Sequence, residues 1–166
     1  MQPRIKVLFV CLGNICRSPL AEGVFRHQVQ QAGLAHAFEI ASAGTGAWHV
    51  GEPPDARMRQ TAQAHGISLA GQRAQQVSPA DLDRYDLVLA MDPTNQRDLQ
   101  ALAARPSSGQ AVRLFRDFDP QPGDRAVPDP YYGGPEGFET VYRIVDRTCR
   151  ALLQHLIDQH QLSVPG

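Results

Sequence analysis

The chain has 166 residues and a formal net charge of −1; 42% of its residues are hydrophobic and 20% are charged. This length predicts one domain over residues 1–166, with a core large enough to fold without metals or cross-links. The near-neutral charge and the scattered basic residues argue against nucleic acid and against acidic membranes as partners. No apolar run is long enough to span a bilayer, so we expect no membrane association.

The chain contains three cysteines, an odd number that cannot form a fully paired disulfide framework. Free thiols are typical of a reducing compartment, where they stay available for chemistry. The apolar run before Cys11 is also too short for a signal peptide. We therefore expect a cytoplasmic protein.

The first predicted element is a strand over residues 4–10. Its nearly continuous apolar side chains are typical of a strand that is covered on both faces, as in the centre of a parallel sheet. A helix follows, with Ser18 as N-cap, Pro19 at the first helical position and Glu22 in the first turns. Gly33 is predicted to end this helix.

The rest of the chain continues the alternation of strands and helices. Strands are predicted at 38–42, 85–90 and 111–115, helices at 55–65, from 78 onward, at 93–104 and at 135–160, and Gly- and Pro-rich loops at 43–54 and 117–137. This order predicts an α/β fold of Rossmann-like type, an open, mostly parallel four-stranded sheet with helices on both faces. Ligands bind such sheets beyond the carboxyl ends of the strands, where the loop starting at Cys11 is expected.

Residues 11–18, with the sequence CLGNICRS, connect the first strand to the first helix. A loop in this place can direct backbone N–H groups and the positive end of a helix at an anion, and phosphate is the natural ligand. Cys11 would lie in the same field, which favours a nucleophilic thiolate. Arg17 ends the loop, and its planar guanidinium can bind two phosphoryl oxygens at once.

Three further residues of this loop have a physical reason to be there. Gly13 allows close approach of the backbone, and Asn14 tolerates a left-handed conformation while its amide braces the loop. Ser18 can cap the helix and also donate a hydrogen bond to the thiolate. The Cys-x5-Arg spacing alone arises often by chance, so its weight depends on the buried strand before it and the helix start after it.

Asp129 is the candidate general acid. Phosphoryl transfer through a covalent enzyme intermediate needs an acid to protonate the leaving oxygen and later a base to activate water. Pro128 and Pro130 restrict the backbone around Asp129, and Tyr131 and Tyr132 offer aromatic walls for an aromatic substrate. On these residues alone, an aspartate that only serves a turn between prolines is the more frequent alternative.

The chain has VCLGNICRSPLAE at residues 10–22 and DPYYG at residues 129–133. With these two segments, near its amino and carboxyl ends, it resembles the low-molecular-weight protein tyrosine phosphatase family. Trp48 and residues 42–45, 51–57, 65–67 and 91–95 are also similar to the family, so the resemblance covers essentially the whole chain. It implies the phosphotyrosine phosphatase I type of fold and hydrolysis of phosphotyrosine in proteins, and of small aryl phosphates, through a phosphocysteine. It implies no cofactor and no metal. The expected partners are a phosphotyrosine-bearing protein substrate and phosphate or other oxyanions, and we expect a monomer.

The resemblance also implies roles for single residues. Cys11 would be the nucleophile, Arg17 the phosphate clamp, and Asp129 the general acid and then the base. The residues expected to bind the phosphate or to line the cleft around the substrate ring are Leu12, Gly13, Asn14, Ile15, Cys16, Ser18, Trp48, Tyr131 and Tyr132.

A supporting hydrogen-bond network is implied for Asn14, Ser18, Ser42 and His65, which would shape the loop and favour the thiolate. Without the resemblance, Ser42 would be read as a strand-end hydroxyl and His65 as a histidine at a helix C-terminus. At 74–76 the chain has Ala-Gln-Gln where the family commonly has Ala-Arg-Gln. We expect this departure to affect partner recognition rather than chemistry.

Three alternatives compete with this hypothesis. Arsenate reductases of the same fold use two further cysteines beyond mid-chain, but this chain has none between Cys16 and Cys149, and Cys149 falls on an apolar stripe. Protein-arginine phosphatases of this fold carry Thr at the position of Ile15, whose apolar side chain disfavours a guanidinium. A catalytically idle binding module would not need both Cys11 and Asp129.

The resemblance further implies that oxidation can link Cys11 and Cys16 reversibly, which would protect the nucleophile from overoxidation. We expect dithiothreitol to restore the activity of peroxide-treated parent protein but not that of Cys16→Ser. Activity assays before and after reduction measure this, and equal recovery of the two proteins would contradict it.

Overall fold

The protein is described by a computed structural model that covers residues 4–103, 112–130 and 134–163. Four strands form one parallel sheet in the order β2-β1-β3-β4. The strands are β1 (Ile5–Cys11), β2 (Phe38–Gly44), β3 (Leu87–Ala90) and β4 (Val112–Leu114).

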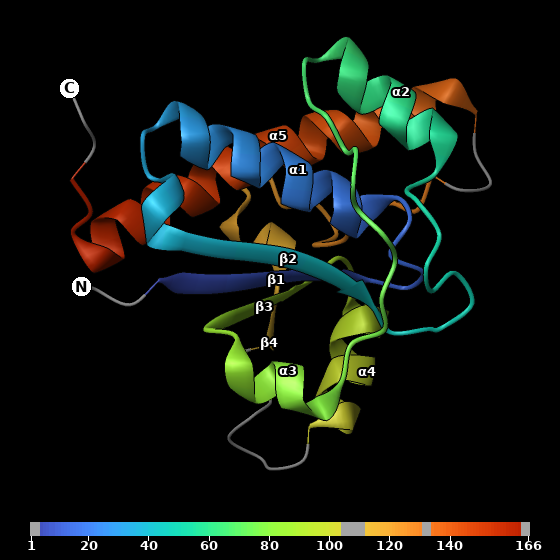
Figure 1. Cartoon of the computed structure of the whole chain (residues 1–166), viewed down its shortest axis with the longest axis horizontal. Helices are drawn as coiled ribbons and strands as arrows, with labels where there is room; N and C mark the ends of the chain where they lie inside the picture. Colours follow the sequence, from blue (N-terminus) through green and yellow to red (C-terminus); the bar gives the residue numbers. More distant parts are fainter. Residues whose placement is uncertain (1–3, 104–111, 131–133, 164–166) are drawn as a thin grey trace.

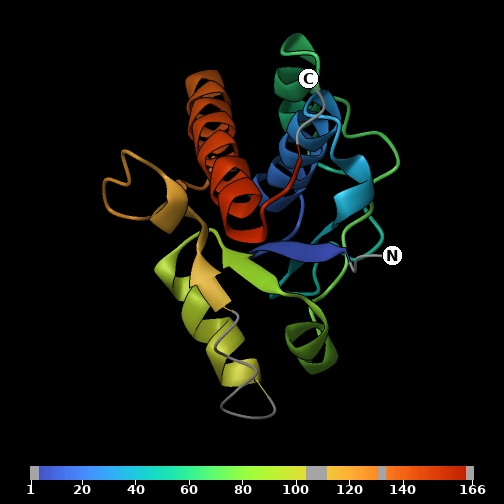
Figure 2. The same ribbon diagram turned by 90° about the vertical axis from the view of Figure 1, so that its left-hand side faces the viewer.

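Helices lie on both sides of this sheet (Figures 1 and 2). On one side are α1 (Arg17–Gln31), α2 (Ala56–Ala64) and α5 (Pro135–His160), and on the other are α3 (Pro79–Arg84) and α4 (Pro93–Leu102). Two short 3-10 helices, Ala35–Ala37 and Phe115–Phe118, complete the described elements. The predicted α/β fold with four parallel strands is confirmed. None of the helices within the described residues has the length and apolar character needed to cross a membrane.

β1 is the central strand, because it pairs with β2 on one edge and with β3 on the other. Val7 and Phe9 face the core beneath α1 and α5, whereas Leu8 and Val10 face the core beneath α3 and α4. Each of these side chains is almost completely buried, which stabilises the fold by about 1.5–3 kcal/mol per residue. The prediction of a strand covered on both faces is confirmed.

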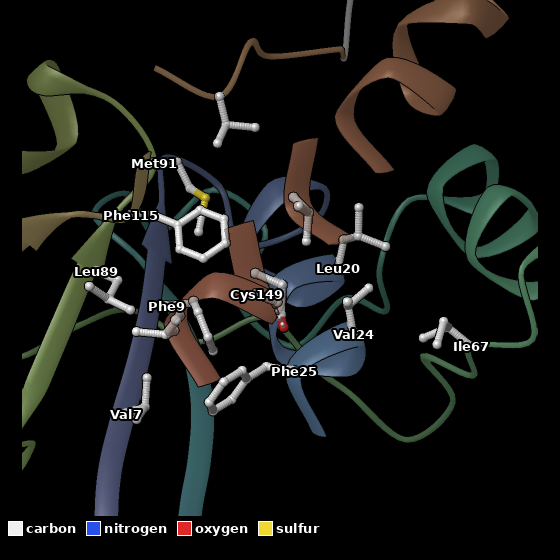
Figure 3. Close-up of a cluster of buried hydrophobic side chains, with 14 of the residues drawn as sticks. Val7, Phe9, Leu20, Val24, Phe25, Ile67, Leu89, Met91, Phe115 and Cys149 are labelled. Atoms are coloured by element: carbon white, nitrogen blue, oxygen red, sulfur yellow. Dashed lines mark hydrogen bonds between the residues drawn. The ribbon is translucent and has the colours of Figure 1, made fainter. Parts of the chain in front are cut away.

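The larger core lies between the sheet and helices α1 and α5 (Figure 3). The ring of Phe9 packs edge-on against Phe25 of α1 and against Phe115, with centroid distances of 5.7 and 5.6 Å. Cys149 of α5 is fully buried in the same core, and burial raises the pKa of its thiol well above the usual value. This cysteine therefore packs as an uncharged apolar group.

The strand order determines which strand ends lie next to each other at the carboxyl edge of the sheet. The chain runs from β1 through α1 to β2 and then crosses to β3 on the opposite side of β1. The carboxyl ends of β1 and β3 are therefore neighbours at the point where the strand order reverses, and such points are ligand sites in open α/β sheets. Cys11 ends β1, and Asp92 follows directly after β3 as the N-cap of α4.

The predicted start of the first helix is wrong. α1 begins at Arg17 with Cys16 at the N-cap, so Ser18 lies inside the first turn and Glu22 lies beyond it. Ser18 cannot cap the helix because its hydroxyl is engaged by Cys11 and Asn14. The predicted end is confirmed, since α1 stops at Gln31 and Gly33 follows with a left-handed φ of 72°.

β2 is longer than predicted. Its register with β1 continues to the pair Cys11 and Gly44, so the first residues of the predicted loop 43–54 belong to the strand. The predicted short helix after residue 78 is confirmed as α3, because Ser78 and Asp81 form a reciprocal capping box. α5 is also confirmed with the predicted bounds.

A buried carboxylate, Asp119, ties the segment that leads to Asp129 to the rest of the fold. Asp119 accepts hydrogen bonds from Arg147 of α5 at 2.8 and 2.9 Å and from Arg116 at 3.0 Å. Arg116 also donates to the carbonyl oxygen of Ala126 at 2.7 Å. The two arginines therefore fix the backbone just before Asp129 against α5 and the end of β4.

This cluster predicts a pH dependence of stability. Burial alone would raise the pKa of Asp119, but hydrogen bonds from Arg147 and the Gln121 N–H, together with the charges of Arg147 and Arg116, lower it to about 2. Because the pKa is lower in the folded state, the stabilisation is present above the unfolded pKa and is lost as the pH falls through the folded one. We expect protonation of Asp119 to lower the free energy of unfolding by about 2 kcal/mol as the pH falls from about 4 to about 2.

Urea denaturation across that pH range measures the effect in the parent and in Asp119→Asn. The variant should lose this part of the acid dependence and should be less stable at pH 7 by about 3 kcal/mol, because the buried guanidinium of Arg116 and the partly buried one of Arg147 lose their counter-charge. Asp158→Asn is the control, since Asp158 is exposed and accepts from Gln154, away from this cluster. Parallel acid profiles for the parent and Asp119→Asn would contradict the assignment.

Candidate active site

A cavity of about 300 Å³ opens at the carboxyl end of β1. It is lined by Cys11, Leu12, Gly13, Ile15, Cys16, Arg17, Trp48, His49 and Asp129. The structure thus brings Asp129, from a distant part of the sequence, together with Cys11 and Arg17 of the loop after β1. Within the described residues, no side chain caps the first turn of α1, whose start at Arg17 borders the cavity.

Asn14 holds the loop between β1 and α1. Its φ is 57°, the left-handed conformation that its type tolerates. Its Nδ2 donates to Ser18 Oγ at 2.8 Å and to Ser42 Oγ at 3.0 Å, while its Oδ1 accepts from the Gln75 N–H at 3.0 Å. Both ends of the buried amide are therefore hydrogen-bonded, so the loop has one stable arrangement.

The hydroxyl of Ser18 donates a hydrogen bond to the sulfur of Cys11. The distance from Ser18 Oγ to Cys11 Sγ is 3.0 Å. Because Ser18 Oγ accepts from Asn14, its own proton remains for donation, and the alternative acceptor, the Ala43 carbonyl oxygen, is farther away at 3.4 Å. A hydroxyl that donates to sulfur stabilises a thiolate more than a thiol.

Ser42 extends this network away from the cavity. It accepts from Asn14 and donates to Glu22 Oε1 at 2.7 Å, and Glu22 in turn pairs with Arg26 at 2.8 Å. The hydroxyl of Ser42 therefore has a fixed direction, from the amide to the carboxylate. Sequence reasoning missed this contact of Glu22 because it assigned Glu22 to the helix start.

His65 does not join the network as expected. Its Nε2 is hydrogen-bonded to Glu139 Oε1 at 2.7 Å, and its ring stacks on Tyr142 at a centroid distance of 3.7 Å. His65 follows the last residue of α2, and both of its partners lie on α5, so it connects these two helices. The expectation that it shapes the anion loop is corrected.

The segment 74–76 has a larger role than expected. The Gln75 N–H donates to Asn14, and the Gln75 side chain donates to the Ser42 carbonyl oxygen at 2.9 Å. The Gly44 N–H also donates to the Gln75 carbonyl oxygen at 2.8 Å. This stretch therefore supports the anion loop from behind, in addition to any contribution to partner recognition.

Arg17 is buried and held in place by the segments after β3 and β4. Its Nη1 donates to Asp92 Oδ2 at 2.8 Å and to the Val127 carbonyl oxygen at 3.0 Å, and its Nη2 lies 3.7 Å from Asp129 Oδ2. Burial alone would lower the pKa of Arg17, but the charges of Cys11, Asp92 and Asp129 and the bond to Asp92 raise it. The guanidinium stays charged beside the cavity.

Sequence reasoning missed the role of Asp92 beside Arg17. Asp92 both caps α4, accepting from the Asn95 N–H at 2.7 Å, and orients Arg17. An acidic residue directly after a strand that neighbours β1 must lie at the same edge of the sheet as Cys11. That placement needs the strand order, which local patterns do not give.

Asp129 stands at the mouth of the cavity. Its side chain is 44% exposed, so solvent and a bound substrate can both reach the carboxylate. The neighbouring Tyr131 and Tyr132, predicted as aromatic walls, lie outside the described residues.

The outer wall of the cavity is apolar. Within the described part of the chain, the exposed large hydrophobic side chains are Leu12, Trp48 and Val50, and the first two line the cavity. His49 also lines it and is hydrogen-bonded to Glu52 through Nδ1. His49 was missed because only its neighbour Trp48 carries the family resemblance.

Cys16 differs chemically from Cys11. Burial and the charges of Asp55, Cys11 and Asp129 raise the pKa of Cys16 far above its usual value. Cys16 therefore stays a thiol beside the cavity. Among the described residues, no group of three or more His, Cys, Asp or Glu side chains could hold a metal ion.

Comparison with known proteins gives a consistent result. Residues 6–162 match the family model described as low molecular weight phosphotyrosine protein phosphatase. The chain is 46% identical over 156 residues to a low molecular weight protein-tyrosine-phosphatase of Streptomyces coelicolor, covering 93% of this chain and 94% of the relative.

Two solved structures are similar over nearly their whole length. YfkJ from Bacillus subtilis has a TM-score of 0.89 and 38% identity, with 95% of this chain and 98% of that chain covered. A protein tyrosine phosphatase from Entamoeba histolytica with Hepes in the active site has a TM-score of 0.88 and 35% identity, with 95% and 99% covered.

The network predicts that Asn14→Ala weakens binding of inorganic phosphate. The substitution leaves the Gln75 N–H without its acceptor and removes the donor to both serine hydroxyls, which should loosen the loop and raise the Kd by about 10- to 100-fold. Titration calorimetry measures the Kd. Asn95→Ala, which changes a buried asparagine of α4, should leave the Kd unchanged; an equal loss in both variants would show a global effect instead.

Proposed function

The chain belongs to the low molecular weight phosphotyrosine protein phosphatase family, and we propose that it hydrolyses phosphotyrosine in proteins by transferring the phosphoryl group to Cys11. The observation that carries this proposal is the arrangement of Cys11, Arg17 and Asp129 around one cavity. The thiol is next to a hydroxyl donor, the guanidinium is fixed and charged, and the carboxylate is accessible. These are the three groups that the reaction needs.

In the first step, the thiolate of Cys11 attacks phosphorus and a sulfur–phosphorus bond forms as the bond to the tyrosyl oxygen breaks. Asp129, protonated at this stage, gives its proton to the leaving phenolate oxygen. Arg17 is held through Nη1 by Asp92, and we propose that its other N–H groups bind the phosphoryl oxygens, whose charge is spread in the transition state.

In the second step, the carboxylate of Asp129 takes a proton from water, and the water oxygen attacks phosphorus. The sulfur–phosphorus bond breaks, which releases phosphate and restores the thiolate of Cys11. Ser18, 3.0 Å from the sulfur, stabilises the thiolate as it leaves. Asp129 ends the cycle protonated and ready for the next substrate.

The cavity wall supports an aryl phosphate as substrate. Leu12 and Trp48 offer apolar surface to an aromatic ring, and we propose that Tyr131 and Tyr132 add further walls. The apolar side chain of Ile15 also lines the cavity and offers no acceptor for the guanidinium of phosphoarginine. The Hepes bound by the Entamoeba relative carries a sulfonate, which supports phosphate and similar oxyanions as ligands here.

The cysteines favour hydrolysis over arsenate reduction. Cys11 and Cys16 line the cavity, but Cys149 is fully buried in α5 with its Sγ 3.9 Å from the Ala21 carbonyl oxygen. A relay of oxidation along three cysteines would need the third thiol to be accessible.

We also propose that the enzyme acts as a cytoplasmic monomer. Among residues 4–103, 112–130 and 134–163, the exposed large hydrophobic side chains gather near the cavity, so they do not form a separate apolar face that needs a second subunit. All three cysteines are free thiols, as in a reducing compartment.

Asp129→Asn tests the mechanism, because it removes the proton donor while keeping the size of the side chain. We expect turnover of a phosphotyrosine peptide to fall by about two to four orders of magnitude. An aryl phosphate with a strongly acidic phenol should lose much less, because its leaving group departs without a proton. Steady-state rates on the two substrates measure this difference.

Asp117→Asn is the matched control, since Asp117 lies on the same segment and accepts from Arg125 at 2.8 Å. The parent is assayed in parallel on phosphotyrosine, phosphoserine and phosphoarginine peptides and on arsenate, and only phosphotyrosine should turn over fast. An unchanged rate in Asp129→Asn would remove this residue from the mechanism. A parent inactive on all four would indicate a binding module.

A further inference from the structure

The indole of Trp48 rests directly on the backbone of Gly46. A Cβ atom placed on Gly46 would lie 1.8 Å from Cζ3 and 2.3 Å from Cε3 of the indole. Non-bonded carbon atoms approach to about 3.5 Å, so only glycine leaves room for the ring in this position. Gly46 is not among the residues with positive φ, and the reason for glycine here is therefore space rather than backbone conformation.

The backbone at Gly46 is fixed to the anion loop. Its N–H donates to the Leu12 carbonyl oxygen at 2.9 Å, and the preceding Thr45 N–H donates to the Cys11 carbonyl oxygen at 2.9 Å. A shift of Gly46 would break these bonds, whereas Trp48 is 73% exposed and can rotate outward. A side chain at position 46 would therefore move the indole and leave the loop in place.

Gly44, two residues earlier, provides a contrast. A Cβ on Gly44 would lie 2.8 Å from the Leu12 carbonyl oxygen and 3.1 Å from the Gly13 carbonyl carbon, which are backbone atoms of the loop itself. Gly44 thus permits the close approach of β2 to the anion loop. Gly46 permits the approach of the indole to the backbone that follows β2.

We propose that Gly46 is a positioning residue that fixes Trp48 as a preformed wall for the aromatic ring of the substrate. This inference rests on the proposed function, because it assigns the indole to an aryl phosphate. Much of the indole surface faces solvent, so contact with Gly46 supplies a large part of what orders the ring. An ordered wall binds a ring more tightly than a mobile one, because less conformational freedom is lost on binding.

Phosphate recognition does not depend on this contact. Apart from the backbone bonds of Thr45 and Gly46, the anion loop is held by Asn14, Ser18, Ser42 and Gln75. The hydrogen bonds among these four residues involve neither the indole nor Gly46. Gly46→Ala should therefore weaken binding of a ligand that has both a ring and an oxyanion, and it should leave binding of the oxyanion alone unchanged.

Benzylphosphonate and inorganic phosphate are suitable probes for this difference. For Gly46→Ala, we expect the Kd of benzylphosphonate to rise by about 3- to 10-fold and the Kd of phosphate to stay within about twofold of the parent. The chain contains one tryptophan, so its fluorescence anisotropy reports Trp48 directly and should fall in the variant. Unchanged anisotropy together with an unchanged ratio of the two Kd values would overturn the proposal.

Trp48→Ala and the double variant Gly46→Ala/Trp48→Ala complete the cycle. Once the indole is gone, alanine at position 46 should cause no further loss of benzylphosphonate affinity. An equal loss with and without the indole would show that Gly46 acts through the loop backbone, which also overturns the proposal.

Gly44→Ala is the positive control, because it should weaken binding of phosphate itself. Turnover is not a readout in this experiment. A parent that binds both probes but hydrolyses no phosphotyrosine would contradict the proposed function, and the comparison of Kd values would still decide the role of Gly46.

Discussion

The amide of Asn14 connects the parts of the protein that must stay together for an anion to bind. Its backbone adopts a left-handed conformation that costs about 1 kcal/mol. Two hydrogen bonds that the side chain donates and one that it accepts offset this cost. These bonds reach Ser18 on α1, Ser42 on β2 and Gln75 on the segment before α3. A displacement of any of these elements therefore changes the shape of the loop.

Arg17 connects the start of α1 to the segments that follow β3 and β4. The loop after β1 provides the guanidinium, while Asp92 after β3 and the Val127 carbonyl oxygen after β4 hold it. The segment that contains Val127 is in turn fixed to α5 by the buried Asp119 and its two arginines. The thiol lies at the end of β1 and the carboxylate on the segment after β4. Hydrogen bonds and ion pairs between charged groups, in addition to apolar packing, set their relative position.

The sequence predicted best those features that depend on neighbouring residues. The buried central strand, the long last helix and the cysteine loop follow from local periodicity and spacing. Contacts between distant segments were missed or misplaced: Asp92 and Gln75 reach the site through strand order, which local pattern does not contain. Ser18 was expected to cap the helix and to contact the sulfur, and only the sulfur contact is formed, because α1 begins at Arg17. The motif at His65 gives no information on the direction of its ring.

The cavity is rigid and buried at one end and open at the other, and the reaction explains this difference. Transfer of a phosphoryl group needs sulfur, guanidinium and carboxylate at fixed distances. Burial and the hydrogen bonds from Ser18 to Cys11 and from Arg17 to Asp92 hold the first two groups there. A tyrosine on the surface of another protein can reach the sulfur only through an open entrance. At that entrance, side chains can be held in place only by local packing. The contact between Trp48 and Gly46 holds the indole in place and leaves the entrance open. Residues of the entrance can therefore change with substrate while the anion loop stays the same.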